Sequence, residues 1–222
     1  MFNLEVQNDR KIKIAAIFNT MRILKKINQG DMYMEAYRGH LDRHGDEFYD
    51  TYILMWELAA YHTPRRILEV GTRTGISLCQ LLSGYIDHSV IERIVTVDIF
   101  TDGFISPAIV KRNLSYLNLP VDKVDIKTGN SLDILPELAE KGEIFDYILI
   151  DGDHSKETAR KDLENANNLI MPGGFILFDD ISDAPGECAL IDVWQAFEES
   201  HKDEYTIFTN MTGKGVGLAI KK

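Results

Sequence analysis

Five polar side chains follow apolar runs of the chain, at points where buried strands are expected to end. Asp98 closes the run Val-Thr-Val-Asp, Asp151 and His154 lie in Asp-Gly-Asp-His, and Asp179 and Asp180 follow a further apolar run. Carboxylates accept hydrogen bonds from hydroxyls and bind hard cations, and a neutral imidazole can take a proton from a hydroxyl near pH 7. These residue types indicate a site for a hydroxylated ligand, a divalent cation or both.

A glycine-rich turn precedes these acids in the chain. The stretch Arg-Arg-Ile-Leu-Glu-Val-Gly-Thr-Arg-Thr-Gly begins at Arg65, places Glu69 inside an apolar run, and is followed by a helical pattern. Gly71 and Gly75 frame the turn, and glycines at a strand-to-helix turn let a ligand lie against the backbone. The tight G-x-G of a dinucleotide-binding fold is missing, so the spacing disfavours a pyrophosphate here.

Asp98 lies at the end of the second predicted strand, beyond the glycine turn. An acid at this place can accept hydrogen bonds from both hydroxyls of a ribose. The alternative is a helix cap or a solvated loop acid. Together with the glycine turn, the position favours the ribose role.

Strand and helix patterns alternate around these residues. The predicted strands are 67–70, 94–97, 124–127, 147–150 and 175–178, and the predicted helices are 76–84, 107–117, 131–141, 155–170 and 189–201. This alternation predicts a parallel sheet with helices on both faces. The carboxyl ends of its strands then share one edge, where ligands bind in open sheets.

The last two apolar runs, 205–209 and 216–220, flank Asn-Met-Thr-Gly-Lys-Gly and predict a hairpin with glycine turn chemistry. The predicted fold is therefore α/β and Rossmann-like. It is a doubly wound, mostly parallel seven-stranded sheet that finishes with an antiparallel C-terminal hairpin strand.

The first 45 residues predict a helical N-terminal extension to a main domain at 46–222. An apolar stripe runs along residues 12–27, and a second helix is expected over Asp46–Tyr61. The segment between them either packs on the main domain or forms a lid over a ligand. The amphipathic first helix could also pack on a second copy, which leaves a homo-oligomer open.

Composition narrows the class of partner. The net charge of -11 argues against nucleic acid, and no apolar run of the sequence is long enough to span a bilayer. The N-terminus lacks the order of a signal peptide, and the two cysteines, Cys79 and Cys188, form no disulfide or zinc pattern. We expect a cytoplasmic protein with a small-molecule partner, and neither nucleic acid nor membrane.

The motifs Ile-Leu-Glu-Val-Gly-Thr-Arg-Thr-Gly and Val-Thr-Val-Asp resemble the first two motifs of the class I S-adenosylmethionine-dependent methyltransferases. The resemblance continues through FDYILIDGDHSKETARKDLENA and LIMPGGFILFDD to the hairpin, over about Asp46 to Lys222. It implies S-adenosylmethionine as cofactor, with Asp98 on the ribose and Asn130 on the adenine amino group, where many relatives carry an acid. The implied cofactor contacts are Glu69, Gly71, Thr72, Gly75, Asp98, Ile99, Phe100, Asn130, Ser131 and Asp151.

The acids after the fourth and fifth predicted strands are expected to gather at the ligand edge. Like charges this close raise one another's pKa, and a divalent cation would relieve that cost. The alternative is that they act separately, as helix caps and loop acids. The pattern resembles metal-dependent small-molecule O-methyltransferases of the catechol and caffeoyl-CoA type, and more closely the macrocin O-methyltransferase and cephalosporin-hydroxylase-like subgroup. That implies magnesium, manganese or calcium on Asp151, Asp179 and Asp180, with Asp180 in place of an Asn.

His154 stands where catechol-type enzymes place a catalytic Lys, which implies a general base. The alternative is a helix-start histidine bonded to Asp151 or Asp153. The predicted function is metal-assisted O-methylation of a small hydroxylated molecule such as a sugar, a phenol or a natural product. A non-catalytic sensor or scaffold that binds S-adenosylmethionine is the alternative.

Overall fold

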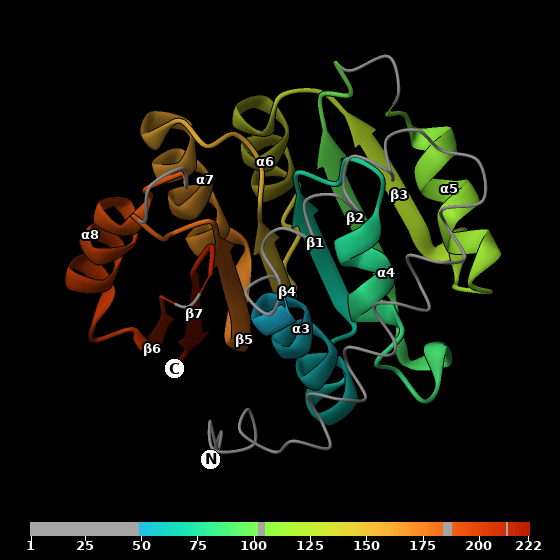
Figure 1. The fold of residues 1–222 in the computed structure, drawn as a ribbon, viewed down its shortest axis with the longest axis horizontal. Coiled ribbons are helices and arrows are strands. Elements are labelled where there is room, and N and C mark those ends of the chain that lie inside the picture. Colours follow the sequence, from blue (N-terminus) through green and yellow to red (C-terminus); the bar gives the residue numbers. More distant parts are fainter. Residues whose placement is uncertain (1–48, 102–104, 184–187, 212) are drawn as a thin grey trace.

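Strands and helices alternate along the chain, as the computed structural model shows for residues 49–101, 105–183, 188–211 and 213–222 (Figure 1). The order is α3 (Tyr49–His62), β1 (Arg66–Val70), α4 (Ile76–Leu82), β2 (Arg93–Asp98), α5 (Pro107–Tyr116), β3 (Val124–Thr128), α6 (Ser131–Glu140), β4 (Phe145–Ile150), α7 (Lys156–Leu169), β5 (Ile170–Asp179), α8 (Ile191–His201), β6 (Tyr205–Asn210) and β7 (Val216–Lys221). Short 3₁₀ turns lie at His88–Val90 and Val121–Lys123.

The strands form one seven-stranded sheet in the order β3-β2-β1-β4-β5-β7-β6. Strands β1 to β5 run parallel, and β7 pairs antiparallel with both β5 and β6. The strand order reverses between β1 and β4, so the loops after these two strands diverge to opposite faces and leave a crevice at the carboxyl edge. The predicted fold class is confirmed.

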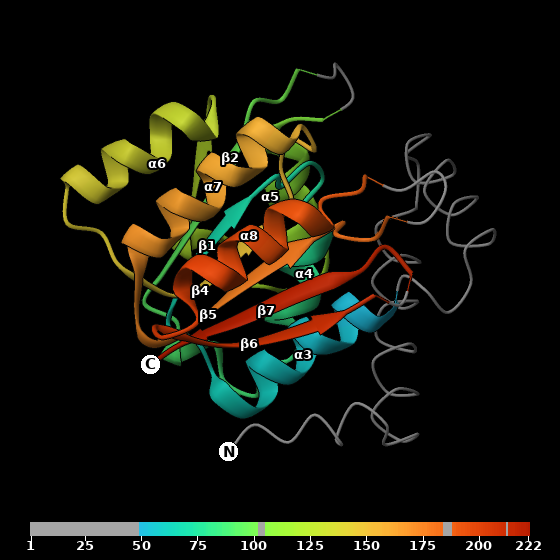
Figure 2. The same ribbon diagram turned by 90° about the vertical axis from the view of Figure 1, so that its left-hand side faces the viewer.

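Alternate residues of each central strand enter two separate hydrophobic cores. Ile67 and Tyr147 pack in the core beneath α3, α4 and α5, whereas Leu68 and Ile148 pack in the core beneath α6, α7 and α8. Figure 2 shows the sheet between these two helical layers. Burial on both faces explains why the strands read as continuous apolar runs.

The element boundaries follow the predictions closely, with one notable difference. Strand β5 begins at Ile170, five residues before the predicted start at 175, because Ile170 pairs with Phe145 ahead of a register shift. The helix expected over 46–61 is present as α3 from Tyr49, where the described chain begins. The N-terminal stripe, the packing-or-lid segment and the domain boundary after residue 45 lie outside the described residues.

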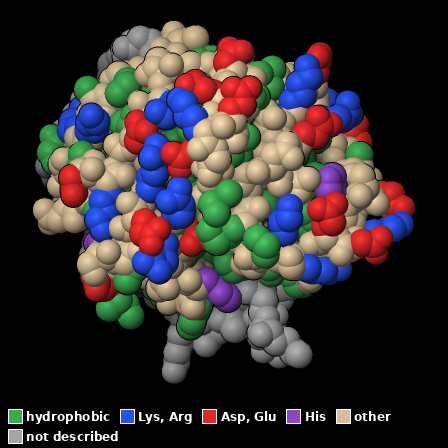
Figure 3. Space-filling view, turned by 180° about the vertical axis from the view of Figure 1, so that it is seen from behind, with side chains coloured by type: hydrophobic (Ala, Val, Ile, Leu, Met, Phe, Trp, Pro, Cys, Tyr) green, Lys and Arg blue, Asp and Glu red, His purple; other side chains and the backbone are tan. Residues whose placement is uncertain are grey.

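The surface mixes charges of both signs. Figure 3 shows one face on which Lys and Arg side chains lie among Asp and Glu. Ion pairs of this kind join Arg66 to Glu143 at 2.7 Å and Arg93 to Asp125 at 3.2 Å. Among the described residues, no helix combines the length and the apolar character needed to cross a membrane.

Candidate active site

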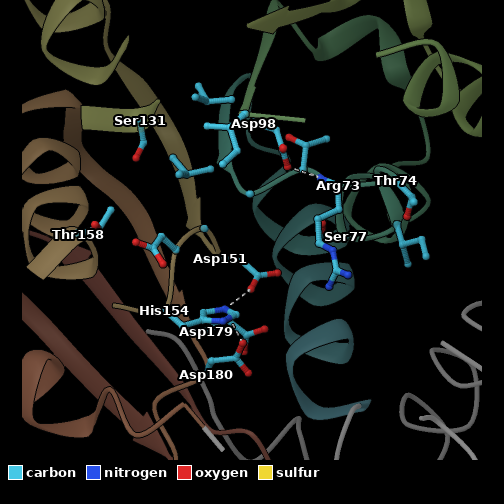
Figure 4. Close-up of a pocket in the computed structure, with 18 of the residues that line it drawn as sticks. Arg73, Thr74, Ser77, Asp98, Ser131, Asp151, His154, Thr158, Asp179 and Asp180 are labelled. Atoms are coloured by element: carbon cyan, nitrogen blue, oxygen red, sulfur yellow. Dashed lines mark hydrogen bonds and ion pairs between the residues drawn. The ribbon is translucent and has the colours of Figure 1, made fainter. Parts of the chain in front are cut away.

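A cavity of about 390 Å³ opens at the carboxyl edge of the sheet (Figure 4). This volume lies in the range of small-molecule sites, about 300–1,000 Å³. Ten of the predicted site residues line it: Gly71, Thr72, Asp98, Ile99, Asn130, Ser131, Asp151, His154, Asp179 and Asp180. Glu69, Gly75 and Phe100, which were also predicted to contact the cofactor, are not among the lining residues.

Gly71 lets the ends of β1 and β4 approach each other. Its φ is +88°, and a Cβ built there would lie 1.8 Å from the backbone oxygen of Asp151. Its N–H donates to the carbonyl of Val97 at 2.9 Å, and the N–H of Asp151 donates to that of Val70 at 2.9 Å. The first glycine of the turn is therefore required by the packing of the neighbouring strand ends.

Glu69 lies beneath the glycine turn. Its carboxyl group is 1% exposed and accepts a hydrogen bond from Ser77 Oγ at 2.5 Å. Burial raises the pKa of Glu69 to about 7, and the hydrogen bond from Ser77 only partly opposes this. Ser77 lines the cavity, so Glu69 is linked to the site by its hydrogen bond from the Ser77 hydroxyl. Ser77 was not among the predicted site residues.

Asp98 lies at the end of β2 and faces the cavity. Its two oxygens accept hydrogen bonds from the backbone N–H groups of Arg73 and Phe100, each at 2.7 Å. Both of these residues have left-handed backbones, each with φ of +47°. An ionised carboxyl offers about four lone-pair sites, so acceptor capacity remains for a diol. Asp98 thus holds two turns and still presents acceptors to a ligand.

Asn130 is the N-cap of α6. Its side-chain carbonyl accepts a hydrogen bond from Leu132 N at 3.0 Å. This bond occupies one of the two lone pairs of the carbonyl oxygen, the atom that was predicted to accept from the adenine amino group. Ser131 follows it and lines the opposite side of the cavity from Arg73 in Figure 4. The adenine role predicted for Asn130 therefore has one lone pair left to it.

Three acids meet at the ends of the neighbouring strands β4 and β5. Oxygens of Asp151, Asp179 and Asp180 all lie within 4.8 Å of one another. Asp179 also accepts a hydrogen bond from Thr51 Oγ1 on α3 at 3.1 Å. Asp153 lines the cavity but bonds to Ser155, the N-cap of α7, so it stays outside this acidic cluster.

Two basic side chains contact the cluster. His154 Nε2 lies 2.9 Å from Asp180 Oδ2 and 3.7 Å from Asp151 Oδ1. Lys214 Nζ lies 2.7 Å from Asp180 Oδ1. The histidine thus bonds to acids, as its alternative interpretation expected, although its nearer partner is Asp180. Lys214 was missed because its segment, Thr-Gly-Lys-Gly, was interpreted only as a hairpin turn.

The charges in the cluster act unequally on its members. Burial raises the pKa of Asp151, and burial followed by the charges of Asp151 and Asp180 raises the pKa of Asp179 well above its ordinary value. Burial alone would also raise the pKa of Asp180, but His154 and Lys214 outweigh it and hold the pKa below its ordinary value. Hydrogen bonds to Asp151 and Asp180 raise the pKa of His154 to about 10. The charge of Lys214 opposes this rise at Asp179 only in part.

The acidic cluster fits a divalent cation. It offers three carboxylate groups against two basic side chains, and carboxylate oxygens are the ligands that magnesium, manganese and calcium prefer. Cys188 Sγ lies within 4.8 Å of ligand atoms of His154 and Asp180, but that mixed set shares only Asp180 with the oxygen set. A bound cation would stabilise the ionised forms of Asp151 and Asp179 most, because the pKa values of these two carboxyl groups are raised.

The sheet order, the glycine turn and the acid at the end of β2 are the features predicted by the resemblance to methyltransferases. Residues 68–181, more than half of the chain, match a family described as a methyltransferase domain. The chain belongs to this methyltransferase family. The predicted relationship to class I methyltransferases is confirmed, whereas the roles of individual site residues stay predictions.

Particular relatives agree with this membership. The chain is 30% identical over 125 residues to a catechol O-methyltransferase of Niastella koreensis, a match that covers 56% of this chain and 52% of the relative. The match therefore spans about half the length of that curated relative.

Solved structures match over most of the chain. An O-methyltransferase from Bacillus cereus, solved in complex with SAH (S-adenosylhomocysteine), is 25% identical with a TM-score of 0.64, covering 90% of this chain and 91% of its own. An SAH-bound methyltransferase from Podospora anserina is 18% identical with a TM-score of 0.66, covering 100% and 97%, and shares the fold.

Proposed function

We propose that this protein is an S-adenosylmethionine-dependent O-methyltransferase that methylates a small hydroxylated molecule with the help of a divalent cation. The observation that carries the proposal is that one cavity holds both a diol-type acceptor, Asp98, and the acidic cluster. Membership in the methyltransferase family and the SAH bound to a relative of the same fold support the cofactor.

The cofactor would lie along the glycine turn and β2. Asp98 presents acceptors for the ribose hydroxyls, Ile99 offers an apolar surface that is 54% exposed, and Ser131 offers a hydroxyl on the adenine side. Thr72 and Ser77 also line this cavity, which holds both Asp98 and the acidic cluster. This arrangement would direct the methyl group toward the acids.

The acidic cluster would position the substrate hydroxyl. Asp151 and Asp179 would hold the cation together with Asp180, and a bound cation would supply the positive charge that lowers the pKa of a hydroxyl. His154 faces the same carboxylates and would hold the proton that leaves the oxygen. It can accept that proton only as the neutral ring, so its role as base requires that the charge of Asp151 and Asp180 be balanced.

A non-catalytic binding protein is not favoured. A sensor of S-adenosylmethionine would need the glycine turn and Asp98, but it would not need the acidic cluster or His154 beside them. Sugars, phenols and other hydroxylated natural products are the proposed substrates, with neither nucleic acid nor membrane as partner. Neither Cys79 nor Cys188 forms a disulfide, which supports the proposed cytoplasmic location.

The test is transfer of an isotope-labelled methyl group from S-adenosylmethionine to a panel of catechols, flavonoids and sugars, with magnesium or with excess EDTA. We expect labelled product in the presence of metal and none with EDTA. His154→Ala should slow the transfer on the order of 10²–10⁴-fold. Full activity in EDTA would show that the three carboxylates are loop acids. Cofactor binding without transfer to any compound would favour the sensor.

A further inference from the structure

The turn between β6 and β7 is fixed against the segment that follows the acidic cluster. The N–H of Ser182 donates to the carbonyl of Lys214 at 2.7 Å, and that of Ile181 donates to the carbonyl of Gly215 at 3.3 Å. Gly215 has φ of +75°, and a Cβ there would lie 2.8 Å from Ser182 N. The glycine therefore allows the two backbones to meet, and the meeting fixes the place of Lys214.

This backbone contact places Lys214 beside the acidic cluster. Asp179 pairs with Val216 at the start of β7, so Lys214 comes just before the paired residues and lines the cavity. Its Nζ lies 2.7 Å from Asp180 Oδ1, and the side chain is 27% exposed against 0% for Asp180. His154 holds the other oxygen of Asp180 at 2.9 Å. Both oxygens of the buried acid thus contact a basic group.

We propose that Lys214 is a built-in counter-ion of the acidic cluster, a positioning residue that holds Asp180 and weakens the hold of the cluster on a divalent cation. The inference rests on the proposed function in that it takes Asp151, Asp179 and Asp180 as the cation site. A fixed positive charge beside a buried carboxylate repels a second cation at the same group, because the local dielectric screens charges less than water does. The acidic cluster therefore binds a divalent cation weakly and exchanges it readily.

The test is a Mn²⁺ titration of the whole chain at pH 8, with free Mn²⁺ followed by its electron paramagnetic resonance signal. Lys214→Met keeps the length of the side chain and removes its charge, and should tighten Mn²⁺ binding by about tenfold or more. Lys214→Arg keeps the charge and should stay within about threefold of the wild type. Lys221→Met is the matched control, since Lys221 bonds to Asn167 on α7 and does not line the cavity.

Equal or weaker Mn²⁺ binding by Lys214→Met would overturn the inference, as would the absence of binding in both proteins. Melting temperatures check the fold, and Lys214→Gln repeats the neutralisation if the Met variant is unstable. In an Asp180→Asn background the effect of Lys214→Met should shrink, because the lysine acts through Asp180. Mn²⁺ binding needs no turnover. Tighter binding without methyl transfer would therefore contradict the proposed function and leave this inference standing.

Discussion

At the residue scale, Asp98 has two roles. It orders two left-handed turns, and it is the proposed acceptor of a ribose diol. Asp98→Ala should weaken the binding of S-adenosylhomocysteine by about 1.5–3 kcal/mol, or roughly 10- to 150-fold, since charge-assisted hydrogen bonds are lost. Titration calorimetry measures the change. Asp122→Ala, at an exposed acid outside the cavity, is the control. Unchanged affinity in Asp98→Ala would show that Asp98 orders the two turns and does not bind the ribose.

Glu69 should make the stability of the protein depend on pH. Burial raises its pKa from 4.5 to about 7. The folded state therefore binds more protons than the unfolded chain between these values, so the free energy of unfolding falls as pH rises through this window. At 1.36 kcal/mol per pH unit the loss is about 3 kcal/mol.

Glu69→Gln should remove most of that slope, because the amide is neutral at every pH. Urea unfolding of the wild type and the variant at several values between pH 4.5 and pH 8 measures it. Ser77→Ala is a useful companion, since it removes the hydroxyl that bonds to Glu69 but keeps the acid. Parallel stability profiles for the wild type and Glu69→Gln would contradict the burial argument.

At the scale of elements, the joint between β1 and β4 depends on Gly71. Gly71→Ala would press a methyl group into the backbone of Asp151, whereas Gly142, also in the left-handed region with φ of +71°, has no atom within 4 Å of a built Cβ. Gly142→Ala should cost about 1–2 kcal/mol of unfolding free energy from backbone strain alone. Gly71→Ala should cost about 4 kcal/mol or more, because strand ends must also move apart.

Urea unfolding of these two variants separates the steric effect from the shared backbone strain. The Gly71 variant should also lose cofactor affinity, because the displaced strand end carries Asp151 into a different position in the cavity. Equal costs at the two glycines would show that the close approach of β1 and β4 is not a constraint on the fold.

Most elements could be predicted because the central strands are apolar on both faces and helices α5, α6 and α7 begin at a side-chain cap. Ser106 and Ser155 begin α5 and α7 by accepting hydrogen bonds from the first turn. The start of β5 could not be predicted, since Ile170 is a strand residue only through its pairing with Phe145. The same limit hid Lys214, whose neighbours in sequence indicate a turn and whose partner, Asp180, is set by the antiparallel insertion of β7.

At the scale of the whole molecule, the reversal of strand order brings polar side chains from distant parts of the chain to the carboxyl edge of the sheet. Asp98 at the end of β2, Asp151 after β4 and Lys214 before β7 line the cavity at the carboxyl edge of the sheet, and Thr51 on α3 bonds to Asp179 there. Figure 4 shows Asp98 and Asp151 at this edge. The sequence could predict which strand ends share that edge, because right-handed crossovers leave little choice. It could not predict which polar groups pair there, because that depends on side-chain reach and burial.

The central claim, that this cavity is an S-adenosylmethionine site, is tested most directly by calorimetric titration of the wild-type chain with S-adenosylhomocysteine and, separately, with NADH. The experiment needs no knowledge of the substrate. We expect S-adenosylhomocysteine to bind with one site per chain and with nearly the same affinity in magnesium and in EDTA, because the proposed cofactor contacts lie along the glycine turn and β2. We expect no binding of NADH, because the turn lacks the tight G-x-G that a pyrophosphate needs. Binding of NADH without binding of S-adenosylhomocysteine would contradict the account.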